Sequence, residues 1–209
     1  MSLTVGIVLT SSFPAFAQEK IPSYKGHKAN VISGTTEVSK MEMSEVLTFD
    51  EIIAEIALSK NISKEQAAAQ VVANFKTDYS TMSISPYAAT YRTLTSYFSV
   101  TTEYQPSLKF YCQTEEWSGS FRAIVSILNV GMNRSSNNMV KQFSGTVYTH
   151  LETANRIFWI VNGDFYNLGS TTVNGGVNIK VGQSAEVNFG VSYATSYYAY
   201  CYKEGYYYF

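Results

Sequence analysis

Charged residues are scarce in this sequence. Lys, Arg, Asp and Glu make up 15% of its 209 residues, whereas about 25% is usual in globular proteins. The net charge is −1, and the chain contains no basic or acidic run. Because binding to nucleic acid needs clustered Lys and Arg, this balance excludes a basic nucleic-acid interface. It also disfavours adsorption to an anionic membrane through charge alone.

Histidine and cysteine are scarce too, and the chain contains only His27, His150, Cys112 and Cys201. This count excludes the His pairs and Cys clusters that hold zinc, and the sequence has no spaced Asp run of the calcium-loop kind. The G-x-S-x-G motif of serine hydrolases is also absent. We therefore predict no metal, no cofactor and no enzymatic activity.

Two groups of residues could nevertheless take part in catalysis. Cys112 and His150 would form a nucleophile pair if the fold brought them together, but alternation places Cys112 on an apolar strand face, which favours an inert thiol. Glu115 and Glu116 stand beside Trp117, and acids next to an aromatic residue are common in sugar sites. Adjacent residues of a strand point to opposite faces, so we interpret this cluster as an acidic loop beside a partly buried tryptophan.

No apolar run reaches the length of a membrane-spanning helix. The first residues read MSLTVGIVLTSSFPAFAQEK, and Ala15-Phe16-Ala17 matches the small-x-small cleavage pattern of a secretory signal peptide. The Lys or Arg expected before the apolar stretch is missing. We predict a signal peptide over 1–17, cleaved near Ala17, and a secreted or cell-surface location. The alternative is a cytoplasmic protein with an apolar N-terminus.

Export has a consequence for the two cysteines. Outside the cytoplasm, two thiols in one small domain commonly pair, so we predict a disulfide between Cys112 and Cys201. In the chain-entropy model the loop it closes would add about 4.5 kcal/mol to stability. The competing interpretation is a pair of buried free thiols, which behave as small hydrophobic residues.

Residues 18–44 are polar and show no sustained period, so we predict a flexible leader there. Segment 45–79 differs, because TFDE at 48–51 and SKEQ at 63–66 both fit the capping-box pattern that opens a helix. Apolar residues follow each signal at helical spacing, which predicts a helical hairpin. The stretch TFDEIIAEIALSKNISKEQAAAQVV is loosely similar to the paired helices of LysM peptidoglycan-binding domains, although the turn that opens such a domain is missing. The interpretation we favour is an amphipathic hairpin packed on its neighbour.

The remaining segment, 80–209, shows the two-residue period of half-buried strands. FRAIVSIL (121–128) and RIFWIV (156–161) are apolar on both faces, which predicts central strands. Turn signals separate the runs, and Asn162-Gly163 and Asn174-Gly175 are the strongest of them. We predict an antiparallel two-sheet β-sandwich of about eight or nine strands, preceded by the helical hairpin. The clearest alternating stripe consists of Ala185, Val187, Phe189, Val191 and Tyr193.

Tyrosine is abundant, with 17 residues in the chain, and many lie in the C-terminal stretch YATSYYAYCYKEGYYYF. In a strand Tyr198, Tyr200 and Tyr202 share one face, while Tyr197, Ala199 and Cys201 share the other, which we predict to be packed. A tyrosine that is half exposed keeps its hydroxyl in water and its ring on apolar neighbours. Structural packing explains most of this cluster, and for the rest we predict that Trp117, Tyr198, Tyr200 and Tyr202 bind a ligand.

Three functional hypotheses remain open. The first is a secreted, non-catalytic module that binds a glycan, a cell-wall polymer or a protein through exposed aromatic residues. The second is a membrane-active or pore-forming protein in which TLTSYFSVTTEY (93–104) inserts as a hairpin. The third is a self-assembling surface protein that adds strands edge to edge. The sequence does not predict an oligomeric state.

Overall fold

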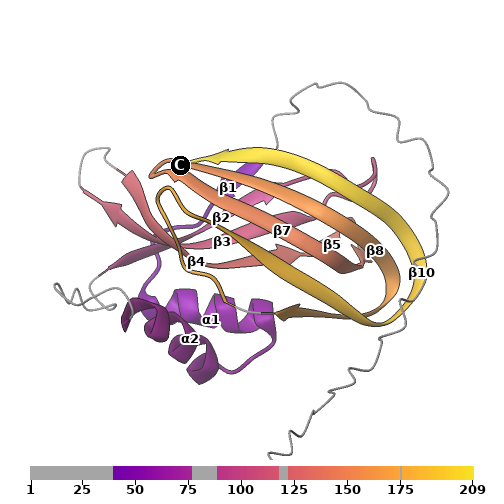
Figure 1. Cartoon of the computed structure of the whole chain (residues 1–209), viewed down its shortest axis with the longest axis horizontal. Helices are drawn as coiled ribbons and strands as arrows, with labels where there is room; N and C mark the ends of the chain where they lie inside the picture. The colour runs from indigo at the N-terminus through magenta and orange to yellow at the C-terminus, as the bar shows by residue number, and fades with distance from the viewer. Residues whose placement is uncertain (1–39, 77–88, 118–121, 175) are drawn as a thin grey trace, which may run out of the picture. The chain divides into compact units, whose positions relative to one another are not determined.

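The computed structural model describes residues 40–76, 89–117, 122–174 and 176–209. Within these ranges the chain forms ten strands and two helices, drawn in Figure 1. The predicted signal peptide and most of the predicted leader lie outside the described residues.

Five strands form the first sheet, in the order β1-β2-β3-β4-β9, and all neighbouring pairs are antiparallel. The sequence pattern does not predict β1, which is three residues long and falls at the end of the predicted leader. The strands are β1 (Met41–Met43), β2 (Thr90–Tyr97), β3 (Ser107–Glu116), β4 (Arg122–Asn133) and β9 (Ile179–Lys180).

Three long strands form the second sheet, and each of them hydrogen-bonds with the other two. They are β7 (Gln142–Thr153), β8 (Arg156–Asn174) and β10 (Ser184–Tyr208). The start of β10 pairs with one edge of β7, whereas its remainder pairs with β8. A short hairpin of β5 (Ser135–Ser136) and β6 (Met139–Val140) connects the two sheets along the chain.

The three strands β7, β8 and β10 pair with one another in a closed ring. This closure is possible because β8 and β10 bend together, as their curved ribbons show in Figure 1. At the bend Gly169, Tyr193 and Ser196 have positive φ values of 135°, 55° and 59°. The predicted apolar stripe of β10 therefore ends early. Val187 and Phe189 are buried, but Tyr193 is 92% exposed, because the left-handed backbone turns its side chain away from the core.

The bend carries β8 around the beginning of β7. There the Thr171 hydroxyl accepts a hydrogen bond from the Phe143 amide at 3.0 Å, and the Gln142 side-chain carbonyl accepts one from the Thr171 amide at 3.0 Å. These bonds satisfy backbone groups at a strand end that the regular ladder would leave unpaired.

The two sheets pack face to face, which confirms the predicted β-sandwich. Of the apolar segments predicted as central strands, residues 122–128 lie in β4, between β3 and β9, and residues 156–161 lie in β8, between β7 and β10. The core contains residues from both sheets, among them Leu94, Leu108, Phe110, Ile127, Val130, Phe143, Val147, Leu151, Ile157, Trp159, Val161 and Phe165.

The predicted helical hairpin consists of α1 (Phe49–Lys60) and α2 (Lys64–Lys76). Thr48 and Glu51 form the capping box, and Asn61 ends α1 in a left-handed conformation, with a φ of 54°. The hairpin packs on the face of the first sheet opposite the sandwich core. This second apolar cluster contains Phe49, Ile52, Ile53, Ile56, Ala57, Ala67, Val71, Tyr91, Tyr111 and Leu128.

The prediction of a turn at Asn162-Gly163 is wrong. Both residues lie inside β8, where Gly163 faces Gly145 of β7 on one side and Cys201 of β10 on the other. A Cβ atom on Gly163 would lie 2.7 Å from the Gly145 Cα atom and 2.8 Å from the Phe143 ring. Glycine occurs here because two strands approach closely over an aromatic ring, which local sequence cannot distinguish from a tight turn.

The predicted disulfide is also wrong, since Cys112 and Cys201 are both buried and free. Cys112 lies close enough to Tyr207 to contribute to the raised pKa of that tyrosine, which is due mainly to burial, and Cys201 contributes in the same way to the raised pKa of Tyr104. Cys201 and Tyr207 belong to the same extended strand and are separated by about 20 Å. The cysteines thus lie at different levels of the sandwich, whereas a disulfide needs Cα atoms within about 7 Å.

Candidate functional site

Trp117 lies directly after β3, in the first sheet, and its side chain is 68% exposed. Its indole N–H donates to the Glu115 carboxylate at 3.1 Å. The neighbouring Glu116 instead accepts two hydrogen bonds from Arg92, at 2.6 and 2.7 Å. The two carboxylates therefore serve different partners. The interpretation of this cluster as an acidic loop beside a partly buried tryptophan is wrong, because both glutamates belong to β3 and Trp117 is largely exposed.

Tyr198 lies at a β-bulge, because the register shifts between Tyr197 and Ala199. The bulge turns Tyr198 toward the sandwich, where its hydroxyl hydrogen-bonds with the Thr101 hydroxyl at 2.9 Å. The Lys141 ammonium lies 4.2 Å from the centre of its ring. The prediction that Tyr198 shares a face with Tyr200 and Tyr202 is wrong, since the extra residue of a bulge reverses the alternation.

The same bulge brings Tyr197 to the outer face of the second sheet, although alternation predicts it on the packed side. Five tyrosines of β10 are now exposed together, and we call them the tyrosine face. Their side chains are 38% to 60% exposed: Tyr197, Tyr200, Tyr202, Tyr206 and Tyr208.

Polar side chains of β8 lie directly across from the tyrosine face. Asp164 is the register partner of Tyr200, and Asn162 is the partner of Tyr202. The Tyr200 hydroxyl donates to the Asn162 side-chain carbonyl at 2.9 Å. These contacts hold hydroxyl, amide and carboxylate groups beside exposed rings.

At the end of β10, aromatic rings form a continuous series across the strands. The Phe158 ring lies 5.1 Å from the Tyr206 ring, and the Tyr206 ring stacks on Tyr208 at 6.0 Å with a 29° angle between their planes. The Arg156 guanidinium lies 5.7 Å from the centre of Tyr206 and pairs with Glu152 at 2.6 Å. This end of the face is therefore ordered by ring contacts and one cation.

His150 lies half-buried on β7, on the outer face of the second sheet opposite Phe158. Cys112 faces the sandwich core from the other sheet. The structure therefore separates the two members of the hypothetical nucleophile pair.

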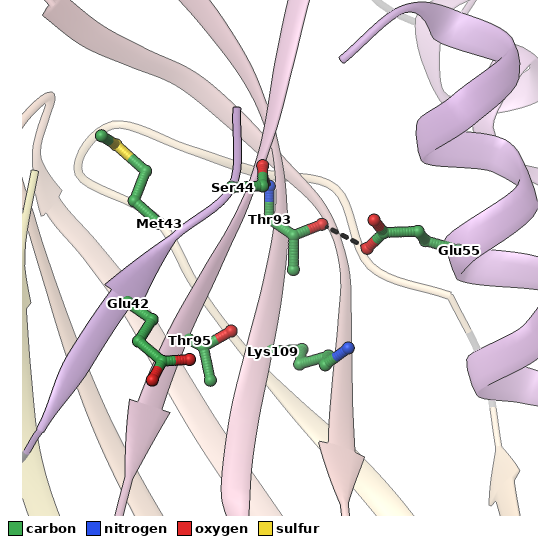
Figure 2. A pocket seen from close by; sticks show the side chains of 7 residues that line it. All are labelled: Glu42, Met43, Ser44, Glu55, Thr93, Thr95 and Lys109. Atoms are coloured by element: carbon green, nitrogen blue, oxygen red, sulfur yellow. Dashed lines mark hydrogen bonds between the residues drawn. The ribbon is translucent and has the colours of Figure 1, made fainter. Parts of the chain in front are cut away.

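A polar hollow of about 200 Å³ opens on the face of the first sheet that carries the helices, between β1 and α1. Figure 2 shows the side chains that line it, with the Thr93 hydroxyl donating to the Glu55 carboxylate at 2.7 Å. The lining residues are Glu42, Met43, Ser44, Glu55, Thr93, Thr95 and Lys109. The sequence carries no signal for this hollow, because its walls come from β1, β2, β3 and α1.

The Glu42 carboxylate at the rim of the hollow already has two partners. The Lys40 ammonium pairs with it at 2.7 Å, and the Tyr97 hydroxyl donates to it at 2.8 Å. These hydrogen bonds, that of Lys40 foremost, hold the pKa of Glu42 below its ordinary value. Glu42 is therefore charged at neutral pH and largely neutralised by Lys40.

Comparisons of the chain with known protein families, curated proteins and solved structures find no match. The loose similarity to LysM helices thus gains no support from them. The described part of the chain contains no helix with the length and hydrophobicity needed to cross a membrane. Across the same residues, no group of three or more His, Cys, Asp and Glu side chains is arranged to hold a metal ion.

Proposed function

We propose that the protein is a non-catalytic binding module that holds an extended glycan or cell-wall polysaccharide along the tyrosine face. The observation that carries the proposal is the row of exposed rings on one strand. From Tyr200 to Tyr208 this row extends over roughly 27 Å. A length of this kind suits several units of a linear polymer better than one small molecule.

The chemistry of the face also supports a sugar ligand. A tyrosine ring offers an apolar surface on which the C–H side of a sugar ring can stack, and its hydroxyl remains available for hydrogen bonds. Asn162, Asp164 and Glu204 add acceptors and donors beside the rings. Because contacts with neighbours already order several of these rings, binding costs little side-chain entropy.

We further propose that the protein is exported. This proposal rests only on the sequence pattern of residues 1–17, and these residues lie outside the part of the chain that the structure describes. Export would bring the tyrosine face into contact with the polymers of a cell surface or its surroundings. A polymer ligand needs no catalytic group, so the proposal agrees with the absence of a catalytic motif in the sequence.

The membrane hypothesis receives less support. Thr93, Leu94, Thr95 and Ser96 of β2 are all buried, with Thr93 and Thr95 on the face that carries α1 and the other two on the face toward the sandwich core. Inserting segment 93–104 into a bilayer would therefore remove a strand with two buried faces. This hypothesis becomes an outcome of the test below.

Co-sedimentation tests the proposal. Purified protein lacking residues 1–17 is mixed with insoluble chitin, cellulose or peptidoglycan sacculi, and separately with liposomes or no additive. We expect retention by at least one polysaccharide, and we expect Tyr200→Ser and Tyr202→Ser each to weaken it by about 1–2 kcal/mol, roughly five- to thirtyfold. Trp117→Ala is the matched control, because Trp117 is exposed but lies on the first sheet, and it should retain the polymer.

Three outcomes would contradict the proposal. Retention that disappears in Trp117→Ala but survives both tyrosine variants would move the site to the end of β3. Retention by liposomes with release of an entrapped dye would favour the membrane hypothesis. Sedimentation without any additive would favour self-assembly through the strand edges.

A further inference from the structure

The floor of the polar hollow is one row of side chains across three strands. Glu42 of β1 is the register partner of Thr95 of β2, and Thr95 is in turn the partner of Lys109 of β3. Neighbouring strands lie about 4.8 Å apart, so the threonine hydroxyl stands between a carboxylate and an ammonium group. Figure 2 shows this row below the Thr93–Glu55 hydrogen bond.

The hollow contains two opposite charges that do not neutralise each other. Lys109 forms no ion pair with a carboxylate in the described part of the chain. Glu55 has one carboxylate oxygen bound to the Thr93 hydroxyl, and the structure gives its other oxygen no partner among these residues. Glu42 is a weaker attractor for a ligand, because Lys40 and Tyr97 already occupy its oxygens.

Thr95 is the third residue of the hollow with hydrogen-bonding capacity left for a ligand. The residue is 8% exposed, and its hydroxyl lines the hollow, where it is open to solvent and forms no hydrogen bond with any described residue. The Thr95 hydroxyl can therefore donate a hydrogen bond to a ligand in the hollow, in exchange for a hydrogen bond with water. Met43 adds an apolar surface at the rim.

We propose that this hollow binds a small zwitterion, a free α-amino acid in its simplest form. The ligand's ammonium group pairs with Glu55, and its carboxylate pairs with Lys109 and accepts a hydrogen bond from the Thr95 hydroxyl. A volume of about 200 Å³ accommodates a small amino acid whose side chain contacts Met43. This site lies on the first sheet and does not depend on the proposed glycan binding.

Nuclear magnetic resonance titration of the full chain tests the proposal, with amide shifts of Ser44, Thr93 and Thr95 as the readout. The probes are L-alanine, L-alanine methyl ester, propionate and glucose, each raised to millimolar concentration. We expect L-alanine to shift these amides. The ester and propionate each lack one charge, and each should bind roughly ten- to a hundredfold more weakly.

Variants identify the groups responsible. Lys109→Met should weaken L-alanine binding roughly ten- to a hundredfold, and Thr95→Val roughly fivefold or more. Lys203→Met is the matched control, since Lys203 is exposed on β10, and it should bind as the unchanged protein does. If Thr95→Val does not fold, Lys109→Met and the four probes still decide the question.

Several results would overturn the proposal. They are the absence of any shift with L-alanine, equal binding of propionate and L-alanine, and equal binding of glucose. Unchanged L-alanine binding in folded Lys109→Met would also do so. The polysaccharide experiment tests variants of other residues, so a negative result for one proposed site leaves the other proposal unaffected.

Discussion

At the scale of single residues, the most buried ion pair among the described residues joins Arg92 and Glu116. Two parallel hydrogen bonds join the side chains, which are 11% and 15% exposed. Arg92 also donates to the backbone carbonyl of Ser44. One guanidinium thus connects β2, β3 and the segment between β1 and α1, a geometry that lysine could not reproduce.

This ion pair predicts a pH-dependent stability. Hydrogen bonds from Arg92 hold the pKa of Glu116 below its ordinary value in the folded protein. The stabilisation is therefore complete above the unfolded pKa, near pH 4.3, and is lost as the pH falls through the lower folded pKa. We expect Glu116→Gln to lower the free energy of unfolding by about 1–3 kcal/mol at neutral pH. The difference in unfolding free energy between the variant and the unchanged protein should become smaller in acid.

Urea denaturation at several pH values measures this effect. Glu115→Gln is the control, because Glu115 is exposed and its partner is the indole N–H of Trp117, and this variant should change stability little. If the difference in unfolding free energy between Glu116→Gln and the unchanged protein stayed constant from neutral to acid pH, the Arg92–Glu116 ion pair would not be the cause of the pH dependence.

At the scale of elements, β10 performs two different tasks along its 25 residues. Its first part closes the ring with β7, and its later part presents the tyrosine face while packing against β8. Gly205 permits the close packing, because its register partner is Trp159 and a Cβ atom would lie 3.0 Å from the Trp159 Cε2 atom. Trp159 itself is fully buried in the core.

Substitution of this glycine tests the packing. We expect Gly205→Ala to lower the free energy of unfolding by about 1–3 kcal/mol, because the added methyl group must displace a buried ring. Gly190→Ala lies in the same strand, where a Cβ atom would meet the Thr172 hydroxyl at an ordinary 3.4 Å. Urea denaturation of both variants should separate them, and equal stabilities would show that Trp159 does not restrict position 205.

At the scale of the whole molecule, three layers share two apolar clusters without a covalent crosslink between Cys112 and Cys201. Both thiols are enclosed by the sandwich. Burial raises the pKa of Cys201 to about 12 and that of Cys112 further above its ordinary value. Thiols of this kind are protonated at neutral pH and react slowly.

Alkylation followed by mass spectrometry checks this state. We expect the folded protein to take up no label, and the denatured protein to take up two labels whether or not a reductant is present. Ser192→Cys, an exposed position on β10, serves as the positive control and should react in the folded protein. If the denatured protein took up label only after reduction, the result would instead support a disulfide between Cys112 and Cys201.

The sequence by itself determined the features that depend on neighbouring residues. Thr48 and Glu51 cap a helix through groups three residues apart, and segments that are apolar on both faces become central strands wherever they pair. The β-sandwich class and the helical hairpin follow from these local periods. Abundant tyrosine at the C-terminus is also visible in the sequence.

Only the tertiary structure decided what depends on distant contacts. A single bulge at Tyr198 reverses the alternation and exposes Tyr197, and close strand approach explains why Asn162-Gly163 does not turn. The walls of the polar hollow come from four elements, so no local sequence pattern predicts it. Bulges, strand approaches and hollows arise from the packing of segments far apart in sequence, and their free energies appear only once those segments meet.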